Sequence, residues 1–187
     1  MAVPSPSPAV DKRAIRTAAR GARAALGDTP PTIAARAEYA ALLARGMIVA
    51  SYAPIGAEAD PGALAGAAEA AGCTIALPHV VDRPTPIRFL ACPTGATLTP
   101  GPFGLLQPPG DAKEVVPDLI LTPLVAFDRT LARLGQGAGH YDRAFARFPN
   151  ARRIGVAFSV QQVDRLPTDP WDMPLHAIIT EREWIVP

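Results

Sequence analysis

A glycine-rich stretch between a strand-like run and a helical pattern constrains the fold of this chain most. Residues 133–143 read RLGQGAGHYDR, with glycine at alternate positions and an arginine at either end. Glycine accepts positive φ angles and lets a ligand approach the main chain. Residues 118–122 before it (DLILT) contain a short apolar run of strand type, and residues 141–148 after it place apolar side chains on one helical face. Because backbone N–H groups and a helix dipole converge at such a junction, it predicts a phosphate-binding loop rather than an ordinary flexible loop.

The rest of the chain alternates helical and strand-like patterns. Helices are expected over residues 11–26, 32–45, 61–71 and 141–148, with a short helical turn at 160–163, and strands over residues 47–53, 74–77, 87–91, 118–122, 153–158 and 176–180. Alternation of this kind favours a single-domain α/β sandwich around a mainly parallel sheet. Ligands of such sheets bind at the carboxyl ends of the strands, so we expect the functional residues to lie there.

Composition excludes several classes of protein. The chain has 187 residues, 49% of them hydrophobic, and a net charge of +1. A nucleic-acid-binding protein normally carries a basic excess, a membrane span needs about 20 apolar residues, and a signal peptide needs an apolar segment that the N-terminus lacks. We expect a cytoplasmic monomer with a disordered, Pro- and Ser-rich tail over residues 1–10 and one domain over residues 11–187.

Cysteine and lysine usage adds two expectations. Cys73 and Cys92 have no metal-ligand spacing and are expected to be buried free thiols in a reducing compartment. Lysine occurs only at Lys12 and Lys113, which suggests a need for a compact ammonium group. Lys113 lies in a Pro- and Gly-rich loop and is interpreted as a solvated charge. Lys12 and Arg16 share one face of a helix start and could grip a polyphosphate, although a solvated surface is the alternative.

Two carboxylates are candidates for a metal site. Asp142 and Asp172 are expected near the carboxyl ends of the strands, where their oxygens could hold a hard cation such as Mg²⁺. Each has a structural alternative. Asp142 stands in the first turn of a helix, where it would stabilise the helix dipole, and Asp172 has the character of a turn residue.

Several ordered segments resemble the 5-formyltetrahydrofolate cyclo-ligases (5,10-methenyltetrahydrofolate synthetases). They are KRAIR at residues 12–16, YAPIGAEAD at 52–60, FGL at 103–105, VAFD at 125–128, RLGQGAGHYDR at 133–143, WD at 171–172 and IITE at 178–181. The resemblance implies a three-layer α/β/α sandwich similar to the ribose-5-phosphate isomerase/CoA-transferase-like (NagB-like) fold. It also implies ATP- and Mg²⁺-dependent conversion of 5-formyltetrahydrofolate to 5,10-methenyltetrahydrofolate, with release of ADP and phosphate.

The resemblance assigns a role to each matching position. The implied ATP-binding residues are Lys12, Arg13, Arg16, Arg133, Leu134, Gly135, Gln136, Gly137, Ala138, Gly139, His140 and Tyr141. The implied substrate-binding residues are Ala53, Glu58, Phe103, His140 and Tyr141. The implied metal ligands are Asp142 and Asp172, and the implied catalytic residues are Lys12, Arg133 and Tyr141.

The chemistry of these side chains suits the implied roles. The Glu58 carboxylate would accept hydrogen bonds from pterin N–H groups. Phe103 and Tyr141 would offer ring faces, although a lone Phe103 in a loop is more often a core residue. For Tyr52, core packing is favoured. Phosphoryl transfer requires positioning and charge neutralisation, which agrees with the lack of a catalytic triad or a reactive cysteine setting in the sequence.

Four positions depart from the family pattern. Leu124 replaces a frequent glycine, Gln107 a frequent glutamate, His140 the first of two tyrosines, and Trp171 a histidine. An imidazole at position 140 can still stack or donate a hydrogen bond. These departures leave open a same-fold relative with a different ATP-dependent substrate, and a nucleotide- or folate-binding regulator without turnover. A sugar-phosphate isomerase or acyl-transferase of similar architecture is a third alternative, with Glu58 as its weak support.

Overall fold

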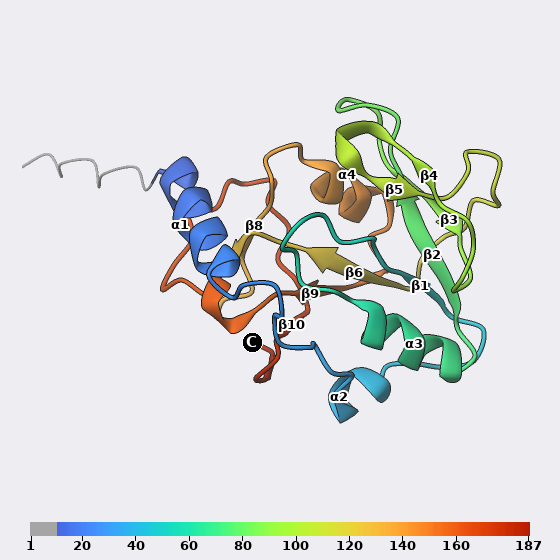
Figure 1. Cartoon of the computed structure of the whole chain (residues 1–187), viewed down its shortest axis with the longest axis horizontal. Helices are drawn as coiled ribbons and strands as arrows, with labels where there is room; N and C mark the ends of the chain where they lie inside the picture. The colour runs from blue at the N-terminus through green and yellow to red at the C-terminus, as the bar shows by residue number, and fades with distance from the viewer. Residues whose placement is uncertain (1–10) are drawn as a thin grey trace, which may run out of the picture.

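One seven-stranded sheet organises the computed structural model, which describes residues 11–187 (Figure 1). The predicted tail, residues 1–10, lies outside the described residues. In spatial order the strands are β11 (Trp184–Ile185), β10 (Ala177–Ile179), β9 (Arg152–Val156), β6 (Leu119–Pro123), β1 (Ile48–Ala50), β2 (Thr74–His79) and β3 (Arg88–Ala91). The five inner strands are parallel, and the two edge strands are antiparallel to their neighbours. The predicted mainly parallel sheet is therefore confirmed.

Helices cover both faces of this sheet. Figure 1 shows α4 (His140–Arg147) on one side, and α2 (Ala37–Ala40) and α3 (Gly62–Ala70) on the other. Side chains alternate between the two faces, as strand geometry requires. Ala50 and Ile120 belong to the core that contains Phe145 of α4, whereas their neighbours Val49 and Leu119 belong to the core that contains Leu64 of α3. The α/β/α layering is confirmed, while the finer likeness to the ribose-5-phosphate isomerase and CoA-transferase fold stays a prediction.

The N-terminal helix does not cover the sheet. Helix α1 (Lys12–Ala24) begins at Asp11, whose carboxylate accepts a hydrogen bond from the Arg13 N–H at 2.8 Å. Its apolar face, with Ala19 buried, packs on the hairpin of β7 (Ala126–Phe127) and β8 (Arg133–Leu134). This hairpin precedes the glycine-rich loop, so its contact with α1 holds the basic face of the helix beside that loop.

The predicted helix over residues 32–45 is wrong, because only α2 is helical there. The preceding residues are not helical, and their Ile33 is 1% exposed within the core beneath α3. Tyr39 is fully buried, and its hydroxyl donates to the Leu64 carbonyl oxygen at 3.1 Å. Tertiary burial of these side chains outweighs the helical propensity of the surrounding alanines.

The pattern also missed several short elements. They are β4 (Thr99–Pro100), the 3₁₀ turn η1 (Pro102–Gly104), β5 (Leu106–Gln107), the β7–β8 hairpin and edge strand β11. The short turn predicted near residue 160 is present as η2 (Ser159–Gln161). Cys73 and Cys92 are buried free thiols, as predicted. Within residues 11–187 no helix is long and apolar enough to cross a membrane.

Gln107 fixes the long loop before β6 to the end of β2. Its side chain is buried and bonds the backbone of Val80 twice: Oε1 accepts from the Val80 N–H at 2.9 Å, and Nε2 donates to the Val80 carbonyl oxygen at 3.2 Å. An amide can both donate and accept, which a carboxylate cannot do when ionised. Glutamine at this departure from the family pattern thus satisfies both polar groups of a buried residue.

The Gln107 contacts predict a stability effect. Gln107→Met keeps the length of the side chain but leaves the Val80 N–H and carbonyl without their partner. We expect the free energy of unfolding to fall by about 2 kcal/mol, measured by urea denaturation. Gln162→Met, at an exposed position, is the control and should change stability by less than about 0.5 kcal/mol. Equal stability of the two variants would contradict this account.

Close packing at Gly155 of β9 predicts a second effect. A Cβ there would lie 2.6 Å from Leu175 Cδ1 and 2.9 Å from Leu124 Cδ2. Gly155→Ala should therefore lower the free energy of unfolding by about 1–3 kcal/mol through overpacking. Gly66→Ala in α3, where a Cβ meets no atom within 4 Å, should instead raise it by up to about 1 kcal/mol. Thermal and urea unfolding of both variants check the opposite signs.

Candidate active site

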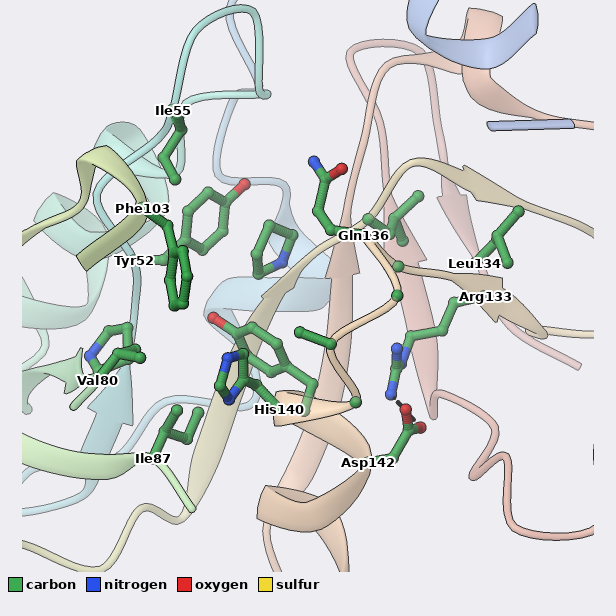
Figure 2. A pocket seen from close by; sticks show the side chains of 18 of the residues that line it. Tyr52, Ile55, Val80, Ile87, Phe103, Arg133, Leu134, Gln136, His140 and Asp142 are labelled. Atoms are coloured by element: carbon green, nitrogen blue, oxygen red, sulfur yellow. Dashed lines mark hydrogen bonds and ion pairs between the residues drawn. The ribbon is translucent and has the colours of Figure 1, made fainter. Parts of the chain in front are cut away.

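A cavity of about 530 Å³ opens at the carboxyl ends of β1, β2 and β6, where ligands of parallel sheets are expected. One end of the cavity is apolar and contains Tyr52, Val80 and Phe103; Figure 2 shows these side chains across from the glycine-rich loop. The other end is charged and contains Arg133 and Asp142, joined by a dashed line in Figure 2. The cavity thus offers a place for a flat ring beside a place for an anion.

The glycine-rich loop turns on two of its three glycines. Gly137 has φ 101° and Gly139 has φ 67°, values that favour glycine, whereas Gly135 keeps a negative φ. Gly139 begins α4 without a side-chain cap, so the first N–H groups of the helix keep their capacity to bind an anion. Arg16 of α1 donates through Nε to the Gly135 carbonyl oxygen at 2.9 Å. The loop is therefore held against α1.

Arg133 lies almost fully buried beneath this loop. Its side chain is 6% exposed, and Nη2 donates to Asp142 Oδ1 at 2.5 Å. The guanidinium also lies 4.8 Å from the ring centre of Phe145. Burial lowers the pKa of Arg133, while the charges of Asp142 and Asp172 oppose that shift. The Arg133 guanidinium therefore remains a cation. The Asp142 carboxylate contacts it directly, and the Asp172 carboxylate stabilises it through its charge without direct contact.

Lys12 makes the second charged contact of the site. Its ammonium lies 2.5 Å from Asp169 Oδ2 and 3.4 Å from Asp172 Oδ2. The hydrogen bond to Asp169 is the main reason that the pKa of Lys12 is raised, so the ammonium stays protonated. Sequence reasoning missed Asp169. Its spacing of three residues from Asp172, across a proline, was the signal available for a turn with both carboxylates at one end.

The two aspartates proposed as metal ligands also have the structural roles that the sequence analysis gave as alternatives. Asp142 stands in the first turn of α4, and Asp172 Oδ2 accepts from the Asp169 N–H at 2.8 Å within a tight turn. In the described part of the chain, no group of three or more His, Cys, Asp or Glu side chains is arranged to hold a metal ion. Two carboxylates nevertheless fit Mg²⁺, which takes one or two protein oxygens and completes its shell with water and phosphate.

Glu58 lines the cavity, and each of its carboxylate oxygens accepts a hydrogen bond. Oε2 accepts from the Ile55 N–H at 3.1 Å, and Oε1 accepts from Gln136 Nε2 at 3.3 Å. Arg20 of α1 donates to the Gln136 side-chain oxygen, which directs the amide nitrogen toward Glu58. The carboxylate is thus coupled through one side chain to the glycine-rich loop.

The two aromatic residues of the apolar end behave differently. Tyr52 is buried, and its hydroxyl donates to the Ala59 carbonyl oxygen at 2.5 Å, in agreement with core packing. Phe103 is not a core residue: it is 54% exposed and lines the cavity. Its φ of 61° is unusual for a residue with a side chain, and Arg83 lies 5.6 Å from its ring centre. The loop therefore presents this ring to the cavity.

His140, which replaces a tyrosine of the family pattern, has a defined tautomer. Its Nδ1 lies 3.1 Å from Arg143 Nη2, and it must accept because a guanidinium only donates. The proton of the neutral ring is then on Nε2, which is buried and has no partner within residues 11–187. Burial lowers the pKa of His140, and Arg143 and Arg83 lower it further. At neutral pH the ring is an uncharged donor at the cavity wall.

Most predicted site residues come together in this cavity. Those that line it are Lys12, Arg16, Ala53, Glu58, Phe103, Asp172 and the whole segment from Arg133 to Asp142. Arg13 does not line it; the residue is exposed on α1, and its N–H serves the helix start. His79 and His176 lie outside it, the first beside the Pro108 carbonyl and the second beside Arg153.

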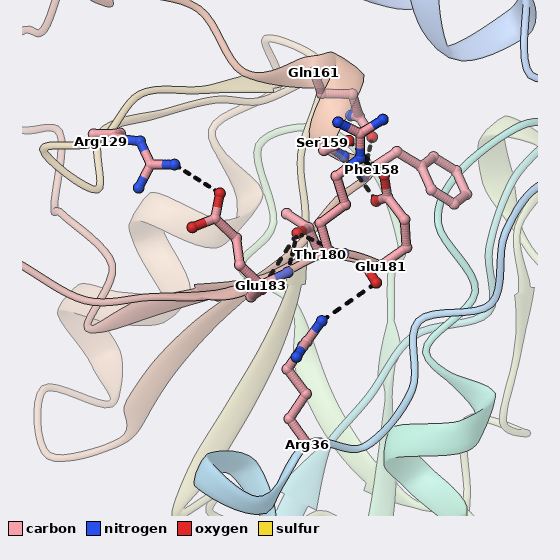
Figure 3. A network of polar contacts seen from close by, with 9 residues as sticks. Arg36, Arg129, Phe158, Ser159, Gln161, Thr180, Glu181 and Glu183 are labelled. Carbon is pink, nitrogen blue, oxygen red and sulfur yellow. Dashed lines mark hydrogen bonds and ion pairs between the residues drawn. The ribbon is translucent and has the colours of Figure 1, made fainter.

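Polar contacts behind the cavity hold its wall at Leu124. Figure 3 shows Glu181, at the end of β10, next to Ser159 of η2, whose N–H donates to Glu181 Oε2 at 2.8 Å. Gln161 of the same turn donates through Nε2 to the carbonyl oxygens of Leu124 and Val125 at 2.8 and 3.0 Å. The ends of β9 and β10 therefore position the segment that follows β6.

Comparisons with known proteins agree with this geometry. A model of the 5-formyltetrahydrofolate cyclo-ligase family matches residues 9–181. A 5-formyltetrahydrofolate cyclo-ligase of Haemophilus influenzae is 43% identical over 83 residues, 41% of this chain and 44% of the relative. One of Mycolicibacterium smegmatis is 32% identical over 155 residues, 75% of this chain and 77% of the relative. The match thus spans less than half of the first of these relatives and about three quarters of the second.

Two solved structures share the fold. A 5,10-methenyltetrahydrofolate synthetase of Aquifex aeolicus superposes with a TM-score of 0.63 at 28% identity, covering 95% of this chain and 84% of that one. A 5,10-methenyltetrahydrofolate synthetase of Mycoplasma pneumoniae has a TM-score of 0.66 at 25% identity, with 92% and 99% covered. The family model covers nearly the whole chain and the fold is shared, as the sequence motifs predicted. The chain belongs to the 5-formyltetrahydrofolate cyclo-ligase family.

Proposed function

We propose that this protein converts 5-formyltetrahydrofolate to 5,10-methenyltetrahydrofolate with hydrolysis of ATP to ADP and phosphate. The observation that carries the proposal is one cavity with a charged end, where Lys12 and Arg133 lie beside a glycine-rich loop, and an apolar end with Phe103 and Glu58. A polyanion and a flat heterocycle can therefore meet in the same space. Family membership supports the reaction.

The nucleotide would bind at the charged end. Phosphate oxygens would accept from the backbone N–H groups at the start of α4 and from Lys12, Arg16 and Arg133. Arg133 and Lys12 already have carboxylate partners at 2.5 Å, so phosphate binding would exchange or share these contacts rather than bring cations from solution. Charges placed in advance are what phosphoryl transfer requires.

The folate would bind at the apolar end. Glu58 is an acceptor-only carboxylate when ionised and suits the adjacent N–H groups of a pterin ring. Phe103 would stack on the ring system, and its exposure and left-handed backbone make it available for that contact. The N5-formyl group would then point toward the terminal phosphate of the nucleotide.

The reaction needs no protein nucleophile. The formyl oxygen attacks the γ-phosphorus, the bond to ADP breaks, and a phosphorylated imidate forms. N10 then attacks the formyl carbon and loses its proton, and the carbon–oxygen bond breaks as phosphate leaves. The protein contributes mainly by holding N10, the formyl group and the phosphate chain in reacting geometry and by excluding water.

Tyr141 and Mg²⁺ have defined places in this proposal. Burial raises the pKa of Tyr141, with Glu58 adding to the shift, so its phenol stays protonated and acts as a donor rather than a base. Asp142 and Asp172 would hold Mg²⁺, directly or through water, and the ion would neutralise phosphate charge. We further propose that the protein is a cytoplasmic monomer that acts on these two small substrates without binding nucleic acid.

The first experiment follows the near-UV absorbance of the methenyl product with 5-formyltetrahydrofolate, ATP and Mg²⁺. We expect product that depends on ATP and disappears with EDTA. Lys12→Ala and Asp142→Asn should each lower kcat/KM by about 100-fold through lost transition-state charge stabilisation. Lys113→Ala, which removes the other lysine at an exposed position, is the matched control and should be unchanged. Bound ATP without product would refute the proposed reaction and favour a drifted relative or a binding protein.

Glu58 should act mainly on folate recognition, because its contact with the glycine-rich loop is through the Gln136 side chain, from which the oxygen of a glutamine at position 58 can also accept. Glu58→Gln keeps the shape of the side chain but replaces one acceptor oxygen with an NH₂ group. This donor would face the donor N–H groups of the pterin, so a hydrogen bond would be lost. We expect the KM for 5-formyltetrahydrofolate to rise by about 10- to 100-fold, as for the loss of a charged hydrogen bond, while the Kd for ATP stays within about twofold. Steady-state kinetics and calorimetry separate the two. A change in ATP affinity of the same size would place Glu58 in the nucleotide site instead.

A further inference from the structure

Trp171 has a large aromatic side chain that lines the cavity and is mostly exposed to solvent. It is 70% exposed, the highest value among the large hydrophobic residues of the described chain, and it lines the cavity. Burying an indole removes more apolar surface from water than burying almost any other side chain. Its exposure at a cavity mouth therefore leaves a favourable contact unmade in the free protein.

The backbone beneath Trp171 is fixed to the charged end. Trp171 stands in a tight turn closed by a hydrogen bond from the Asp172 N–H to the Asp169 carbonyl oxygen at 3.0 Å. Pro170 occupies the position that proline favours in such turns. Both aspartates contact the Lys12 ammonium. The indole is thus attached to the part of the site that holds the phosphate-binding cations, while Glu58 and Phe103 belong to the proposed folate end.

The order of groups in the two substrates then decides which ring reaches Trp171; this step rests on the proposed function. The pterin and its formyl group must adjoin the terminal phosphate, because that is where the reaction occurs. The base of the nucleotide is joined to the opposite end of the phosphate chain, so it lies beyond the cations and away from the pterin. The geometry points to Trp171 as the stacking surface for the nucleotide base.

The family pattern has a histidine at the position that Trp171 occupies in this chain. An indole has a larger π-face than an imidazole, and stacking on a base is tolerant of the identity of the base. Trp171 therefore contributes to nucleotide affinity through the ring, and the cations contribute through the phosphates. Loss of the ring should therefore weaken the binding of ATP but leave the binding of a polyphosphate without a base unchanged.

Fluorescence and calorimetry test the inference on the full chain. Trp184→Phe leaves Trp171 as the sole tryptophan, and its emission should respond to ATP with Mg²⁺ but little to inorganic tripolyphosphate with Mg²⁺. If that variant does not fold, the difference between wild type and Trp171→Phe gives the same signal. Trp171→Ala should raise the Kd of ATP about tenfold and leave the Kd of tripolyphosphate within twofold, whereas Trp171→Phe should keep most of the ATP affinity.

Three results would overturn the inference. Equal weakening of ATP and tripolyphosphate by Trp171→Ala would mean that the residue only supports the turn that holds Lys12. An unchanged Kd for both would remove Trp171 from the site, and emission that responds to 5-formyltetrahydrofolate but not to ATP would assign the ring to folate. Because these are binding measurements without turnover, a protein that meets them but forms no methenyl product would refute the proposed reaction and not this contact.

Discussion

The burial of the Arg133 cation beneath the glycine-rich loop is the constraint on which the site depends. A guanidinium that is 6% exposed needs a close anion, and Asp142 in the first turn of α4 supplies it. This pair fixes the start of α4 against strand β8, and Phe145 of the same helix lies against the guanidinium. The ion pair therefore joins the two ends of the loop between Arg133 and Asp142. This contact holds the loop and the orientation of its backbone N–H groups.

Helix α1 adds a second set of ties around the same loop. Lys12 contacts the turn of Asp169 and Asp172, and Arg16 binds the Gly135 carbonyl. Each cation proposed for phosphate binding is thus paired within the protein before a ligand arrives. Such pairing lowers the free energy of the unliganded state, and it also holds the cations near the positions that a polyphosphate would need. The hairpin contact with Ala19 keeps α1 in place for this purpose.

The departures from the family pattern are accommodated by their neighbours. Leu124 fills the space above Gly155, which has no Cβ to meet it. Gln107 serves both polar groups of Val80, and Arg143 sets the tautomer of His140. In each case a second residue supplies what the substitution requires. Trp171 differs, since it is 70% exposed at the cavity, which leaves its ring accessible to a nucleotide base.

The sequence by itself determined the layers, the mainly parallel sheet and a glycine-rich loop at the start of a helix, because two- and 3.6-residue periodicities and alternating glycines are local signals. It also determined the family, through motifs in a fixed order. Only the tertiary structure decided that residues 32–45 are mostly not helical, since the burial of Ile33 and Tyr39 depends on α3. It alone joined Lys12 to Asp169, which is 157 positions away, and presented Phe103 to the cavity. Contacts between distant segments follow from how the elements pack, and a local pattern contains no record of that packing.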